Sequence, residues 1–76
     1  MAKEVNPKFS FLKGWYQVQQ KDVQSVRDEL MIALGITTSP AFLMRLYGRI
    51  EPKVSEAAAI EQVFRKYNIT SIWGAE

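Results

Sequence analysis

Apolar residues recur at intervals of three and four along three segments of this chain, which is the spacing of one face of an α-helix. In the first segment the apolar stripe consists of Val23, Val26, Leu30 and Leu34. Asp22 is a suitable N-cap, and Gly35 suits the left-handed position that follows many helices. The pattern predicts a helix over residues 22–34.

A second, shorter helix is predicted over residues 39–47, after a corner rich in hydroxyl groups. Thr38 or Ser39 can accept a hydrogen bond from the free amides at its start. Pro40 suits the first helical position, because its missing N–H would be unpaired there anyway. The buried residues of this helix are expected to be Phe42, Leu43 and Leu46. Gly48 is expected to end it.

The third helix is predicted over residues 55–67, after a loop that contains Pro52. Ser55 is expected to cap it, and the alanines that follow are strong helix formers. Its buried face is expected to consist of Ala59 or Ile60, with Val63, Phe64 and Tyr67.

The two ends of the chain have a different pattern. Large and polar groups alternate over residues 15–19, and β-branched and aromatic residues gather over residues 69–73, so both segments are candidate strands. If they pair, the ends of the chain meet under the helices; the alternative is that both segments are irregular. Residues 1–10 show little periodicity and are expected to form a loose lead-in. The rest, residues 11–76, is expected to form one domain.

Composition agrees with a small folded domain. The chain has 76 residues, of which 47% are hydrophobic and 12% aromatic, well outside the range of disordered sequences. A chain of this length supports one core at most. The expected fold is therefore mainly α: a compact helix-turn-helix domain of three main helices with short terminal strands. No apolar window approaches the roughly 20 residues of a membrane span, so a cytoplasmic protein is expected.

The residue types argue against catalysis. Histidine and cysteine are absent, which removes the usual general base, most metal ligands and most activated nucleophiles. Asp28 and Glu29 are neighbours on a predicted helix and do not face each other, and the Glu56 and Glu61 pair does not converge on a substrate either. No phosphate-binding, dinucleotide-binding or calcium-binding motif is present. We expect no enzymatic activity, no cofactor, no metal and no small-molecule substrate.

Two short helices joined by a tight corner suit binding in the major groove of duplex DNA. The candidate DNA-binding residues lie at the corner, on the second helix and in the basic loop after it: Thr37, Thr38, Ser39, Met44, Arg45, Arg49 and Lys53. The alternatives are that one hydroxyl residue only caps the helix, and that the basic residues are solvated or bonded to Glu51. The net charge of +2 is only mildly basic.

Residues 29–70 resemble the lambda-repressor-like, Xre/Cro-type helix-turn-helix family. In the family pattern an apolar helix ends in Leu-Gly-Ile and is followed by a Ser/Thr corner. Leu34, Gly35 and Ile36 match the end of that helix in this chain. A recognition helix then ends near a glycine, a basic residue and a proline, for which Gly48, Arg49 and Pro52 stand in this chain. The resemblance implies a small transcriptional regulator that binds DNA half-sites as a homodimer.

Two other functions fit the same sequence. The first is a protein-interaction module that keeps the fold without DNA binding and uses Phe42, Met44 and Tyr47 to fill an apolar groove. The second is RNA binding, with Trp15 and Tyr16 stacking on unpaired bases. These two residues and Trp73 are otherwise expected in the core, or in a dimer seam.

Overall fold

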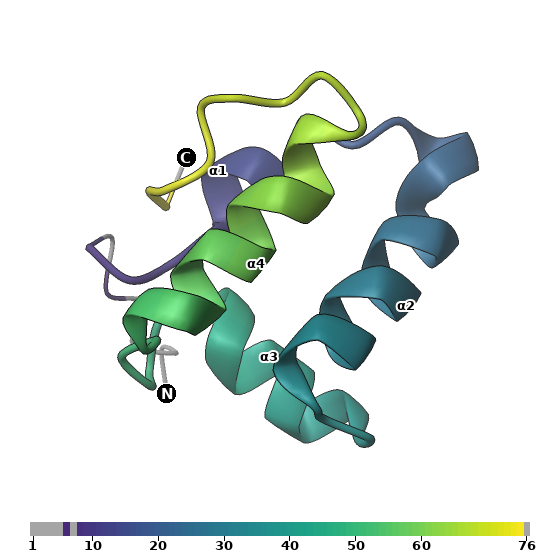
Figure 1. The fold of residues 1–76 in the computed structure, drawn as a ribbon. Helices are drawn as coiled ribbons and strands as arrows, with labels where there is room; N and C mark the ends of the chain where they lie inside the picture. The colour runs from purple at the N-terminus through teal and green to yellow at the C-terminus, as the bar shows by residue number, and fades with distance from the viewer. Residues whose placement is uncertain (1–5, 7, 76) are drawn as a thin grey trace, which may run out of the picture.

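The computed structural model describes residue 6 and residues 8–75, which form a bundle of helices with short connections (Figure 1). The elements in chain order are α1 (Leu12–Trp15), the 3-10 turn η1 (Gln20–Asp22), α2 (Val23–Leu34), α3 (Ser39–Leu46) and α4 (Val54–Arg65). The described residues contain no strand, and the expected mainly α class is confirmed. The Cα radius of gyration is 11.3 Å, close to the value of about 11.4 Å for a compact domain of this length.

The long helices α2 and α4 lie side by side, and α3 closes one end of the pair (Figure 1). The helical stretch Gln20–Leu34 and the helix Ser39–Leu46 are bent by 90° relative to each other. None of the described helices is by itself long and apolar enough to cross a membrane; these two meet that criterion only together, as a bent pair.

The three predicted main helices are present, but two of their expected caps are wrong. Thr38 caps α3, since its hydroxyl accepts from the Ala41 N–H at 3.3 Å. Ser55 does not cap α4, which begins one residue earlier. There the Glu56 carboxylate accepts from the Lys53 backbone N–H at 2.9 Å, so a side chain inside the helix satisfies the amide. The Asp22 side chain makes no capping bond at the start of α2, because a 3-10 turn leads into that helix.

The predicted terminal strands are wrong, although the chain ends do meet. Residues 15–19 hold the end of α1 and the turn after it, and residues 69–73 form no ladder. A helical turn forms instead because Phe11, Leu12 and Trp15 place their large side chains on one helical face toward the core. The ends are joined by a single parallel bridge between Phe11 and Gly74. The Gly14 N–H also donates to the Ile72 carbonyl at 3.0 Å.

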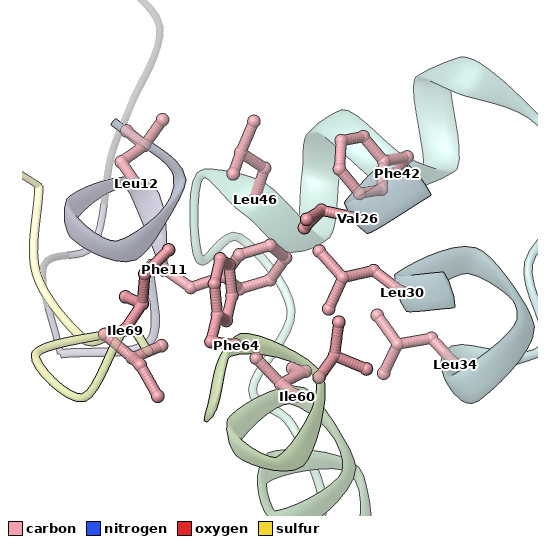
Figure 2. Close-up of a cluster of buried hydrophobic side chains, with 12 residues drawn as sticks. Phe11, Leu12, Val26, Leu30, Leu34, Phe42, Leu46, Ile60, Phe64 and Ile69 are labelled. Carbon is pink, nitrogen blue, oxygen red and sulfur yellow. The ribbon is translucent and has the colours of Figure 1, made fainter. Parts of the chain in front are cut away.

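The core is built from all four helices and the C-terminal tail (Figure 2). Phe64 and Phe11 lie at its centre, with ring centroids 6.0 Å apart in an edge-to-face contact. The remaining buried apolar residues are Leu12, Val26, Leu30, Leu34, Phe42, Leu46, Ile60, Val63, Ile69 and Ile72. Every residue of the α2 stripe except half-buried Val23 is in this core, as the spacing predicted.

The segment before α1 is held against the end of α3. The Ser10 hydroxyl is fully buried and donates to the Leu46 carbonyl at 2.8 Å, and the Asn6 N–H donates to the Tyr47 carbonyl at 3.0 Å. The backbone passes so close to Gly48 that an added Cβ would lie 2.5 Å from the Ser10 nitrogen. Of the expected lead-in, residues 1–5 and 7 lie outside the described part, while Asn6 and Ser10 are anchored.

Candidate nucleic-acid interface

The corner between α2 and α3 consists of four residues, 35–38. Gly35 ends α2 in the left-handed region, with φ of 67°. The Ile36 N–H donates to the Met31 carbonyl at 3.0 Å and the Gly35 N–H to the Ile32 carbonyl at 3.2 Å, which satisfies carbonyls that the helix end leaves free. The chain then leaves in an extended conformation at Thr38, which starts α3 in its new direction.

Helix α3 has one buried and one exposed face. Phe42 and Leu46 are buried against the core. Leu43 was expected to be buried, but its side chain is 38% exposed and lies beside Met44, which is 41% exposed. The prediction was wrong because Leu43 lies about 100° around the helix from Phe42 and about 60° from Leu46, at the edge of the buried face. A shallow groove of about 220 Å³ runs over this face, lined by Pro40, Leu43, Met44, Tyr47 and Arg49.

Arg45 faces α4 and is paired there. Its two terminal nitrogens donate to the two carboxylate oxygens of Glu56 at 3.0 and 3.2 Å, a bidentate pair. The side chains are only 16% and 20% exposed. The pKa of Glu56 is lowered, first by the bond from the Lys53 backbone N–H and then by Arg45. Contact of Arg45 with DNA requires this pair to open; its partner is Glu56, where the sequence suggested Glu51.

A cation that the sequence pattern did not single out lies at the start of α3. The Arg27 guanidinium of α2 donates to the Ser39 hydroxyl at 2.6 Å and lies 5.6 Å from the Phe42 ring centroid. Arg27 is four residues after Val23 and seven before Leu34, so it borders the buried stripe of α2. This spacing places Arg27 at the edge of the buried face of α2, where a neighbouring helix is expected. The sequence does not show that this neighbour is α3.

The other candidate residues lie at the two ends of α3. The hydroxyl residues Thr37, Thr38 and Ser39 are exposed at its start. Arg49 and Lys53 are exposed in the loop that follows its end. Together with Arg27 they place positive charge at both ends of the helix, with the exposed Met44 between them. The Arg45 guanidinium is instead bonded to an acidic side chain of α4.

Glu29 of α2 and Glu61 of α4 are bonded to residues of α4 or of the segment that follows it. Glu29 pairs with Lys66 and accepts from the Tyr67 hydroxyl at 2.5 Å. These bonds, that from Lys66 first, lower the pKa of Glu29, and the same carboxylate raises the pKa of Tyr67. Glu61 accepts from Arg65 and from the Trp73 ring nitrogen. Within residues 6 and 8–75, no group of three acidic side chains is placed to hold a metal ion.

The aromatic residues near the chain ends divide between core and surface. Trp15 is half-buried and packs edge-to-face on Phe42, with ring centroids 5.5 Å apart. Trp73 is half-buried and packs on Phe11 at 6.3 Å. Tyr16 is 65% exposed. Because the Trp15 ring packs in the fold, Trp15 and Tyr16 do not form a pair of exposed rings for stacking on bases.

Comparison of the chain with protein-family models, with curated proteins and with solved structures finds no match.

Proposed function

We propose that this protein binds duplex DNA sequence-specifically, as a small transcriptional regulator that works as a homodimer and docks α3 in the major groove. One observation carries the proposal: α3 follows α2 at 90° after a four-residue corner with a left-handed glycine. Two helices at roughly 90–120° joined by three or four residues are the geometry of a DNA-binding helix-turn-helix.

The charges around α3 support this orientation. Arg27 lies at the start of the helix, and Arg49 and Lys53 follow its end, so cations flank the surface that would enter the groove. Contacts of lysine and arginine side chains with phosphates supply much of the affinity for duplex DNA and fix the orientation of the protein on it. Thr37 and Ser39 add hydroxyl groups at the N-terminal end of α3, where backbone amides favour a phosphate oxygen.

The exposed middle of α3 sets the expected base preference. Leu43 and Met44 offer only apolar contacts, and the apolar group that DNA presents in the major groove is the thymine methyl. Arg45, which would otherwise read guanine, is held by Glu56. We therefore expect half-sites with A·T pairs opposite the middle of α3.

The test is selection from randomised duplexes with the purified protein, followed by affinity measurements at several salt concentrations. Arg49→Ala and Lys53→Ala should weaken binding evenly across sequences and reduce the salt dependence by about one ion each. Met44→Ala should weaken only sites that carry the selected thymine. Arg65→Ala is the matched control, because its side chain is 63% exposed at the far end of α4 (Figure 1).

Failure to enrich any motif, with no duplex bound at low salt, would refute the proposal. Single-stranded RNA is included in the same selection. Enrichment of RNA alone would replace duplex DNA by RNA as the ligand.

A second candidate function is supported by the apolar character of the exposed α3 face. Pro40, Leu43, Met44 and Tyr47 recur at helical spacing there, although Phe42, expected on that face, is buried. Such a stripe suits a helix that binds in a groove of another protein. A stoichiometric protein complex that survives nuclease and high salt, and that Met44→Glu abolishes while Arg49→Ala does not, would favour this function over DNA binding.

A further inference from the structure

The Glu56 carboxylate, in the first turn of α4, is bonded to two segments of the candidate nucleic-acid interface. Its Oε1 accepts from the Lys53 backbone N–H at 2.9 Å and from one terminal nitrogen of Arg45 at 3.0 Å. Its Oε2 accepts from the other terminal nitrogen of Arg45 at 3.2 Å. A single side chain of α4 therefore joins the last turn of α3 to the end of the basic loop.

This arrangement holds the Arg45 guanidinium in one direction. The side chains of Arg45 and Glu56 are mostly buried, so water competes weakly for their hydrogen bonds. Two parallel bonds between a guanidinium and a carboxylate also fix the orientation of the arginine. The Lys53 amide holds the carboxylate by a separate bond, so the acceptor is preorganised for Arg45. Release of Arg45 would leave the charge of Glu56 without its arginine partner, which is costly for a mostly buried carboxylate.

Arg45 lies at an edge of the exposed face of α3. It follows the exposed Met44, so it is offset from that residue by about 100° around the helix. From that edge the long side chain of an arginine can turn either toward α4 or toward the exposed face. A guanine edge accepts two N–H bonds from one arginine, at O6 and N7. The terminal nitrogens of Arg45 give two such bonds to Glu56, so the carboxylate and a guanine compete for the same donors.

We propose that Glu56 is a specificity-determining residue, which keeps guanine out of the half-site by holding Arg45 away from the bases. This inference rests on the proposed function and deepens it. Glu56 does not contact the DNA; it acts through Arg45 and is therefore a positioning residue. Specificity depends on contacts denied to a competing partner as well as on contacts made to the preferred one. Here the denied contact is the bidentate pair of arginine with guanine.

The same pair gives Arg45 a role that differs from base reading. Arg45 neutralises an acid that lies beside Lys53, where a bare carboxylate would repel phosphates. Arg45→Ala should therefore weaken binding to all duplexes alike and leave the selected motif unchanged. An arginine that reads guanine behaves differently, since its loss relaxes the preference at one position of the site.

The experiment is selection from randomised duplexes with the unchanged chain, Arg45→Ala, Glu56→Gln and the variant that carries both substitutions. Glutamine keeps an oxygen that can accept from the Lys53 N–H but lacks the charge that holds the guanidinium. Glu56→Gln should select guanine at a position of the half-site where the unchanged chain does not. It should bind that site roughly tenfold more tightly than the unchanged chain does. The double variant should lose the guanine preference.

Glu61→Gln is the matched control. It also removes one negative charge from α4, but its carboxylate accepts from Arg65 and from the Trp73 ring nitrogen. It should change the affinity for all duplexes alike, without changing the motif. Circular dichroism will verify that each variant is folded.

If folded Glu56→Gln selects the motif of the unchanged chain, or if Arg45→Ala alone changes that motif, the inference is overturned while the proposed function stands. If none of these proteins enriches a duplex motif, both are overturned.

Discussion

Gly48→Ala is expected to be among the most destabilising single-methyl changes in this protein. Gly48 has φ of 76°, a conformation that costs a residue with a Cβ about 1–2 kcal/mol. The new Cβ would lie 2.5 Å from the Ser10 nitrogen and 2.6 Å from the Asn6 carbonyl oxygen, both backbone atoms that cannot rotate away. The segment before α1 must therefore move off the end of α3.

That movement breaks hydrogen bonds from the Asn6 N–H to Tyr47 and from the Ser10 hydroxyl to Leu46. Each is worth about 1 kcal/mol net, so the expected total loss is roughly 3–4 kcal/mol. A domain of this length has a free energy of unfolding of roughly 4–11 kcal/mol, so the change removes a large share of it.

Gly35→Ala is the matched control. Gly35 has nearly the same φ, 67°, but no atom lies within 4 Å of its added Cβ. Only the conformational cost applies there, about 1 kcal/mol after the lower entropy of the unfolded alanine chain is included. Urea unfolding monitored by tryptophan fluorescence gives both values. Equal losses for the two variants would refute the argument that backbone contact at Gly48 anchors the N-terminal segment.

Three further predictions concern charged and hydroxyl groups. Arg45→Ala should lower the free energy of unfolding by roughly 1–3 kcal/mol, because the mostly buried charge of Glu56 then lacks its arginine partner. If the stability losses of Arg45→Ala and Glu56→Gln add in a double-mutant cycle, the two side chains do not stabilise each other and this prediction is wrong. The pKa values of Glu29 and Glu56 lie below their ordinary value of 4.5. The stability that these two ionised carboxylates contribute to the fold is therefore complete above about pH 4.5 and is lost as the pH falls through the lowered pKa values. In thermal unfolding, Glu29→Gln should lose less stability on acidification than the unchanged protein. The raised pKa of Tyr67 gives stabilisation that is present below pH 10 and lost as the pH rises through that higher pKa, and Tyr67→Phe should remove this alkaline dependence.

The three main helices were predictable because each carries its own signal. Val26, Leu30 and Leu34 repeat at helical spacing, and Gly35 and Gly48 mark two of the helix ends. The short α1 was not predictable in the same way. Its four residues are held by contacts with the C-terminal tail, which lies far away in the sequence, and the alternation over residues 15–19 matched a strand by coincidence.

The candidate interface was predictable as a region but not residue by residue. The hydroxyl corner, Arg49 and Lys53 are exposed where the sequence suggested. Arg45 was assigned to the surface because its place on α3 follows the corner, but its direction depends on where α4 lies. Arg27 was overlooked for the same reason, since it meets Ser39 only after α2 and α3 cross.

The sequence by itself determined the three main helices, most of their buried residues and the absence of histidine and cysteine chemistry, because these follow from local spacing and residue type. Only the tertiary structure decided which charges remain exposed. Arg45 and Glu56 are 11 residues apart, and Arg27 and Ser39 are 12 apart, so each pair forms only when two helices pack at a particular angle. The same packing brings Phe9, Val54 and Trp73 together around one open pocket, a neighbourhood that no local pattern contains.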